Sequence, residues 1–207
     1  MRSVCVYASS CDGHIPQIRQ AAADMGRALA LRQFELVYGG AAIGLMGIMA
    51  DAALAAGGHV VGYVPLEIRD SEPVHPHLRE IHAVSGLQAR KSQMMQRADA
   101  FVALPGGFGT MDEILEVLTA RQVLLHNKPI VFWNVNGYWD PLFGVFDHVI
   151  TCGFAHSTHK ELYSVADTLE EVFQSITKPQ PHVMDPRMAK WNGRARDEFL
   201  AKLKERT

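Results

Sequence analysis

Short runs of apolar residues alternate along the chain with longer segments whose apolar residues recur every three or four positions. The short runs predict buried β-strands, and the longer segments predict amphipathic helices. We expect strands at residues 4–8, 35–38, 59–64, 81–84, 99–104 and 130–133. We expect helices at residues 15–32, 45–56, 86–97, 109–125 and 140–151. Because such alternation gives a parallel sheet covered on both faces, the pattern predicts an open, doubly wound α/β fold.

The strand expected at 99–104 leads directly into a glycine-rich turn. Residues 105–113 read Pro-Gly-Gly-Phe-Gly-Thr-Met-Asp-Glu, and the next helix is expected to begin among them. Glycines let the backbone approach a ligand, and the free N–H groups of a helix start attract anions, so this turn predicts a phosphate site. A carboxylate beside a phosphate, here Glu113, favours chemistry or recognition of sugar hydroxyls. The alternative is that Asp112 and Glu113 only complement the helix dipole.

A second glycine turn, Gly39-Gly40, follows the strand expected at 35–38. Both turns therefore lie at the carboxyl ends of strands, where this architecture binds ligands. Neither turn has the GxGxxG spacing with an acidic residue on the next strand, and the GxxxxGK[ST] loop does not occur in the sequence. The pattern favours a mononucleotide site over a dinucleotide site.

Composition narrows the class of protein further. The 207 residues, 48% of them hydrophobic, can bury one sizeable core. A formal net charge of -2 gives no basic footprint for nucleic acid or for an acidic membrane. The apolar run at 4–8 is too short for a signal peptide, no run reaches membrane-spanning length, and the three cysteines lack a CxxC spacing, so we expect a cytoplasmic protein. The ten histidines show no convincing metal spacing, and we expect neither a metal nor a cofactor.

The pattern changes at Lys178. Residues 178–182, Lys-Pro-Gln-Pro-His, predict a stiff linker, and residues 186–206 predict a charged tail helix. Its basic residues are interleaved with acids, which is typical of a solvated face and not of a nucleic-acid patch. We therefore expect one nucleotide-binding domain over residues 1–177 and a tail over residues 178–207, whose apolar residues could dock on the body or on a second subunit.

The turn at 105–113 resembles the PGGxGTxxE signature of the Lonely Guy proteins, which are cytokinin riboside 5'-monophosphate phosphoribohydrolases. Further segments are similar to motifs of this family in the same order: residues 38–47 to YGGGxxGLMG, Arg90-Lys91 to its RK pair, residues 126–129 to HxKP and residues 134–138 to NxxGY. Several motifs in order are far more specific than one glycine loop. The resemblance covers roughly residues 4–173.

The resemblance implies a Rossmann-like fold, a homodimer with sites near the subunit interface, and cleavage of the N-glycosidic bond of an adenosine 5'-monophosphate. It places Arg90 and Glu113 at the catalytic positions of the family. It places the following residues at nucleotide-binding positions: Glu72, Arg90, Lys91, Gly107, Phe108, Gly109, Thr110, Met111, Asp112, Glu113 and Thr119. The chemistry agrees, because positive charge developing on the ribose suits an anion and negative charge on the departing base suits a cation.

The chain departs from the family pattern around the expected pocket. Ala41 replaces a third glycine, Leu87-Gln88 replaces Met-His before Arg90, and Ala120 replaces a tryptophan. These changes bear on substrate preference more than on reaction type, so either adenine or an N6-modified adenine remains open as the natural base. Two alternatives also stay open, a general AMP nucleosidase and a non-catalytic carrier of a nucleotide or other phospholigand. Lysine decarboxylation, a name attached to some such proteins, would need a Schiff-base lysine, for which we find no candidate.

Overall fold

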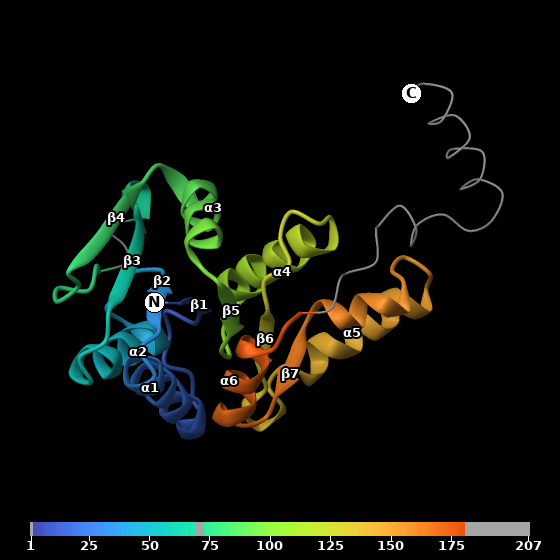
Figure 1. The fold of residues 1–207 in the computed structure, drawn as a ribbon, viewed down its shortest axis with the longest axis horizontal. Coiled ribbons are helices and arrows are strands. Elements are labelled where there is room, and N and C mark those ends of the chain that lie inside the picture. Colours follow the sequence, from blue (N-terminus) through green and yellow to red (C-terminus); the bar gives the residue numbers. More distant parts are fainter. Residues whose placement is uncertain (1, 69–72, 181–207) are drawn as a thin grey trace.

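The computed structural model describes residues 2–68 and 73–180, and its centre is a seven-stranded parallel sheet (Figure 1). The strand order is β4-β3-β2-β1-β5-β6-β7. The strands are β1 (Ser3–Tyr7), β2 (Glu35–Tyr38), β3 (Val60–Pro65), β4 (Glu80–Val84), β5 (Ala100–Ala103), β6 (Ile130–Trp133) and β7 (Ser164–Ala166). Val4 pairs with Leu36 on one side and with Ala100 on the other, so β1 lies at the centre of the sheet.

Helices cover both faces of this sheet (Figure 1). The helices are α1 (Pro16–Leu31), α2 (Gly44–Ala55), α3 (Gly86–Arg97), α4 (Phe108–Gln122), α5 (Asp140–Thr151) and α6 (Leu169–Thr177), with shorter 3-10 turns η1 (Leu66–Ile68), η2 (Val135–Gly137) and η3 (Ser157–Leu162). Val4 and Val6 pack with α1, α2 and α6 on one face, whereas Cys5 and Tyr7 pack with α3, α4 and α5 on the other. Because alternate residues of β1 enter two separate cores, the strand reads as one continuous apolar run.

The strand order reverses between β1 and β5. The chain moves from β1 outward to β4, then returns to β5 on the other side of β1 and continues to β7. α1 follows β1 on one face of the sheet and α4 follows β5 on the opposite face, so the loops that lead into these helices diverge. Ligands of doubly wound sheets bind in the crevice that such a reversal leaves at the carboxyl ends of the strands.

The predicted fold class is confirmed by this sheet. The strands at 35–38 and 130–133 and the helices at 86–97 and 140–151 have their predicted bounds. The other predicted elements shift by at most three residues at either end. The tail helix predicted at 186–206 lies outside the described residues. Within the described part of the chain, no helix has the length and apolar character needed to cross a membrane.

The sequence pattern missed β7 and α6. β7 has only 3 residues, which is too short for a period to be recognised. α6 does carry a local signal that we did not use. Thr168 Oγ1 accepts a hydrogen bond from the Glu171 N–H group, and Glu171 accepts one in return from the Thr168 N–H group. This capping box, Ser/Thr followed three residues later by Glu, marks a helix start.

Candidate active site

A cleft of about 430 Å³ opens at the carboxyl ends of β1 and β5. The loop after β1, one side of α3, and the glycine turn with the first turns of α4 form most of its walls. The lining residues are Ala8, Ser9, Ser10, Cys11, Met46, Leu87, Arg90, Lys91, Gly107, Phe108, Gly109, Thr110, Asp112 and Glu113. The structure therefore brings most of the predicted site residues, which come from two distant segments, into one cleft.

The glycine turn presents the start of α4 to this cleft. α4 begins at Phe108, and its N-cap residue, Gly107, has an extended backbone and provides no side-chain cap. The first N–H groups of the helix therefore remain available to an anion. A Cβ on Gly106 would overlap the Thr110 side chain, so a glycine is needed for the turn to pack this closely on the helix. The arrangement suits a phosphate group.

Arg90 and Glu113 form a buried ion pair in the same cleft. Arg90 Nη2 donates to Glu113 Oε1 at 2.7 Å, and the two side chains are only 9% and 10% exposed. Burial raises the pKa of Glu113 above its usual value, and the charge of Arg90 opposes this rise. Arg90 Nε is buried without a hydrogen-bond partner among the described residues. A buried polar atom without a partner is rare in folded proteins, and Arg90 itself lines the cleft.

The second glycine turn makes room for this guanidinium. A Cβ on Gly39 would lie 2.7 Å from Arg90 Nη2 and 3.0 Å from Met46 Sδ. Both separations are too short for ordinary contact, so any side chain at position 39 would displace Arg90 or Met46. The turn after β2 therefore contributes to the site by the absence of a side chain.

Lys91 lies in the cleft with its charge already compensated. Its Nζ contacts Asp112 Oδ2 at 2.9 Å and Glu116 Oε2 at 2.5 Å. Burial lowers the pKa of Lys91, but the two carboxylates outweigh that effect and the pKa is raised. Lys91 is therefore a protonated link between α3 and α4, next to the ion pair of Arg90 and Glu113.

Among the described residues, two that were predicted to bind the nucleotide do not line the cleft. Met111 packs against the core beneath α4. Thr119 lies further along α4, where its hydroxyl donates to the Leu115 carbonyl and the residue lines a different groove. Glu72 lies outside the described residues. The roles of these three residues stay predictions.

The loop after β1 supplies lining residues that the sequence analysis did not assign. Ser9, Ser10 and Cys11 lie at the mouth of the cleft, and Ser9 Oγ accepts a hydrogen bond from the Cys11 N–H group at 2.9 Å. Polar residues directly after a central buried strand are the signal that could have identified them, because that position faces the crevice of a doubly wound sheet.

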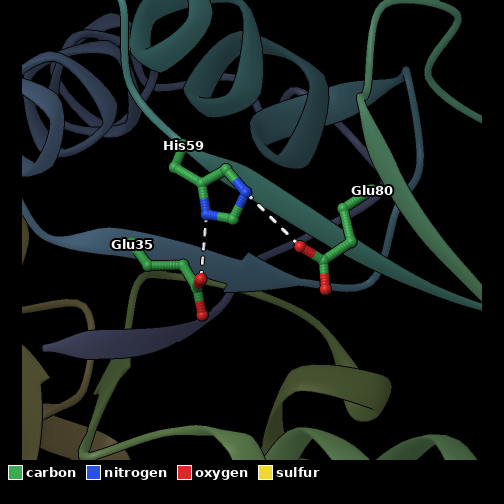
Figure 2. Close-up of side chains that lie close together, drawn as sticks. All are labelled: Glu35, His59 and Glu80. Carbon is green, nitrogen blue, oxygen red and sulfur yellow. Dashed lines mark hydrogen bonds and ion pairs between the residues drawn. The ribbon is translucent and has the colours of Figure 1, made fainter. Parts of the chain in front are cut away.

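A second cluster of ionisable residues lies at the opposite, amino ends of the strands. Glu35, His59 and Glu80 offer potential metal-ligand atoms within 4.8 Å of one another, with His59 between the two carboxylates (Figure 2). Both oxygens of Glu35 also accept hydrogen bonds from Arg97, each at 2.8 Å. Because a guanidinium already occupies Glu35, we interpret the cluster as an ion-pair network that joins the amino ends of β2, β3 and β4.

Comparisons with known proteins identify the family of this chain and agree with its fold. Residues 46–176 match a family model described as "Possible lysine decarboxylase". The chain is 37% identical over 180 residues to the cytokinin riboside 5'-monophosphate phosphoribohydrolase LOG3 of Arabidopsis thaliana, covering 87% of this chain and 84% of that protein. It is 38% identical over 180 residues to the cytokinin riboside 5'-monophosphate phosphoribohydrolase LOG of Oryza sativa subsp. japonica, covering 87% of this chain and 74% of that protein.

Fold and cleft together define a Rossmann-like α/β protein in which the uncapped start of a helix lies beside a buried ion pair. The chain belongs to the family of cytokinin riboside 5'-monophosphate phosphoribohydrolases. Solved structures share the fold at lower identity. The molybdenum cofactor carrier protein of Chlamydomonas reinhardtii is 22% identical with a TM-score of 0.63, covering 86% of this chain and 100% of that chain. The molybdenum cofactor binding protein of Rippkaea orientalis is 20% identical with a TM-score of 0.64, covering 86% and 98%.

Proposed function

We propose that this protein hydrolyses the N-glycosidic bond of adenosine 5'-monophosphates, with or without an N6 substituent, and releases the free base and ribose 5-phosphate. The observation that carries the proposal is the buried pair of Arg90 and Glu113 beside the uncapped start of α4. An anion site alone would serve any phospholigand. A buried cation and carboxylate next to it match the charges that develop when a glycosidic bond breaks. The names of the relatives from Arabidopsis and rice give the same activity.

The bond changes assign each group a role. Cleavage of the C1'–N9 bond leaves positive charge on the ribose and moves the bonding electron pair to the base. The Glu113 carboxylate favours the cationic ring and accepts a proton from the water whose oxygen bonds to C1'. The base takes a proton from solvent as it leaves, while Arg90, which stays protonated, stabilises its negative charge. The N–H groups at the start of α4 and the Thr110 hydroxyl hold the 5'-phosphate.

Neither Lys91 nor Lys128 fits the role of the lysine that a lysine decarboxylase needs. A Schiff-base lysine needs a neutral amine, whereas Lys91 contacts two carboxylates and has a raised pKa. Burial lowers the pKa of Lys128, but its Nζ donates to the carbonyls of Met95 and Gln96. Lys128 precedes β6 at the amino end of the sheet, away from the cleft. Neither Lys91 nor Lys128 therefore provides the Schiff-base lysine that pyridoxal phosphate requires.

A non-catalytic carrier is the alternative from another class. Such a protein would use the start of α4 to bind a nucleotide or another phospholigand intact. Burying an ion pair has a large desolvation cost, and a carrier gains nothing from placing Arg90 and Glu113 next to the phosphate site. A general AMP nucleosidase would share the chemistry and differ only in its preference for the base.

Incubation with AMP and, separately, with isopentenyladenosine 5'-monophosphate tests the proposal. Free base and ribose 5-phosphate are followed by chromatography, and adenosine is the control that lacks the phosphate. We expect base release from the nucleotides and little from adenosine, and the ratio of the two nucleotide rates separates cytokinin release from general AMP turnover. Recovery of intact bound nucleotide without base release would refute hydrolysis and favour the carrier.

We also propose that two copies of the chain associate through α4 and α5. A groove of about 310 Å³ between α4, α5 and η3 is lined mainly by apolar side chains. None of the residues of α5 is fully buried, although the helix covers the sheet, and Val145 is 55% exposed. Association is favourable when a partner covers an apolar surface of this kind, because the surface is removed from water. Because Thr119 lines this groove, its predicted contact would be with a nucleotide bound to the partner subunit.

We also propose that the protein is cytoplasmic. Cys5, Cys11 and Cys152 are all free thiols, and two of them are exposed. Exposed free thiols are typical of a reducing compartment. Fractionation of cells that produce the full chain tests this location directly.

A further inference from the structure

Tyr138 links the loop after β6 to the glycine turn after β5. Its hydroxyl donates a hydrogen bond to the Gly106 carbonyl oxygen at 2.7 Å, across 32 residues of sequence. Tyr138 does not line the cleft, whereas Gly107, the residue that follows Gly106, does. The Tyr138 hydroxyl therefore contacts the glycine turn after β5 from outside the cleft.

The geometry of the peptide unit gives this bond a direction. In a planar trans peptide, the carbonyl of one residue and the N–H group of the next point in opposite directions. Because the Gly106 carbonyl points toward Tyr138, the Gly107 N–H group points away from Tyr138. That N–H group directly precedes the free N–H groups of α4, which begins at the next residue.

The peptide unit that Tyr138 holds is also the easiest one in the turn to rotate. It joins two glycines, and neither has a Cβ to restrict rotation of the backbone. A single hydrogen bond to the carbonyl oxygen can therefore select one orientation of the unit.

The loop that carries Tyr138 is itself well supported. Asn134 is buried, and its Oδ1 accepts a hydrogen bond from the Trp139 N–H group at 2.8 Å. Asn134 Nδ2 donates to Asp140 Oδ1 at 2.8 Å. The Tyr138 ring lies at right angles to the Trp139 ring, with centroids 5.0 Å apart. The phenol is thus held by β6 and by the start of α5.

From these contacts we propose that Tyr138 is a positioning residue that turns the Gly107 N–H group toward the substrate phosphate. This inference rests on the proposed use of the cleft for a nucleoside 5'-monophosphate. Tyr138 acts through the backbone of Gly106, so its contribution depends on the phosphate and not on the base. Loss of its hydroxyl weakens the binding of ligands that carry the phosphate and leaves the binding of ligands without it unchanged.

The substitution Tyr138→Phe tests this inference because it retains the ring against Trp139 and removes only the hydroxyl. Calorimetry measures the affinity of the full chain for ribose 5-phosphate, AMP and adenosine. We expect about five- to tenfold weaker binding of the two phosphate ligands, with adenosine unchanged. If base release from AMP is measurable, KM rises by a similar factor and kcat changes little.

Thr177→Val is the matched control. The Thr177 hydroxyl also donates to a backbone carbonyl, that of Phe173 at 2.7 Å, but it does so at the end of α6, and Thr177 does not line the cleft. We expect this variant to bind all three ligands as the wild type does. If Tyr138→Phe weakened the binding of AMP and of adenosine equally, or weakened neither, the positioning role would be overturned. Wild-type binding of ribose 5-phosphate without base release would refute only the proposed hydrolysis, and the comparison of variants would still decide the role of Tyr138.

Discussion

Arg90 Nη2 lies 2.7 Å from Glu113 Oε1, in a cleft where both side chains are almost fully buried. The pair joins α3 to α4 and holds the carboxylate in place before any ligand binds. A preorganised charge of this kind stabilises a transition state without the cost of reorienting solvent. Arg90 Nε is buried without a hydrogen-bond partner among the described residues.

Substitution Glu113→Gln should lower kcat for base release by about 10²- to 10⁴-fold, because the amide can neither take a proton nor favour a cationic ribose. The amide oxygen can still accept from Arg90, so the fold should be retained. Glu170→Gln is the matched control, since Glu170 also pairs with an arginine, Arg32, but on the surface. Near wild-type turnover by Glu113→Gln, with folding shown by circular dichroism, would remove Glu113 from the mechanism.

The pH profile of kcat/KM should show an acid limb set by Glu113. Burial raises the pKa of this carboxyl above 4.5, and Arg90 only partly opposes the rise. The charged form is the active one, so activity should fall as the pH decreases through this raised pKa, with a midpoint above 4.5. The limb should be absent from the residual activity of Glu113→Gln. A midpoint at or below 4.5 would contradict this assignment.

Substitution Gly39→Ala should lower kcat/KM by about 10²-fold, because a displacement of about 1 Å in a catalytic group has an effect of that size. The new methyl group would lie 2.7 Å from Arg90 Nη2, and the guanidinium would have to move. Gly58→Ala, shortly after α2, is the control because its Cβ would also be crowded, at 2.7 Å from Ala30 Cβ, but outside the cleft. If Gly39→Ala and Gly58→Ala had equal activity, the position of Arg90 would not matter for the reaction.

Substitution Val145→Glu should weaken self-association by about 100-fold or more, because an unpaired carboxylate would be buried in the apolar interface. Sedimentation analysis over a range of concentrations measures the effect. Leu31→Glu is the control, since Leu31 is an exposed apolar residue of α1 on the other face of the sheet. If Thr119 completes the partner's site, activity should fall together with association. An unchanged dimer in Val145→Glu would place the interface elsewhere.

Substitution Arg97→Ala should lower the free energy of unfolding by about 1–3 kcal/mol at neutral pH, because it leaves the buried Glu35 carboxylate without its main partner. The hydrogen bonds from Arg97 are the largest cause of the lowered pKa of Glu35. A carboxyl whose pKa is lowered by folding stabilises the protein above pH 4.5, and this contribution is lost as the pH falls through the lowered pKa. The difference between wild type and variant should therefore shrink in acid.

Urea titrations at neutral and acidic pH measure that difference. Arg27→Ala removes an exposed pair with Asp24 and should cost less than about 1 kcal/mol. Equal effects of Arg97→Ala and Arg27→Ala at neutral pH would show that the network around Glu35 adds no more than a surface ion pair.

Much of the fold could be predicted because its signals are local. The apolar runs of β2 and β6 and the glycine turns after β2 and β5 are properties of neighbouring residues, and they define the doubly wound class. The same locality explains what was missed. β7 is too short to show a period. Residues 9–11 match no functional motif by themselves, and they become part of the cleft only because the sheet places them beside α4.

The sequence by itself determined the parallel sheet and the glycine turn that starts α4, and through the family motifs it predicted catalytic roles for Arg90 and Glu113. Only the tertiary structure decided that these two side chains meet, that Gly39 makes room for them, and that Tyr138 holds the Gly106 carbonyl. The physical reason is that each of these contacts joins segments that come together only when β1, β2, β5 and β6 pair in the sheet. The spacing of residues along the chain does not predict such a contact, because the strand order sets the distance between the two segments that make it.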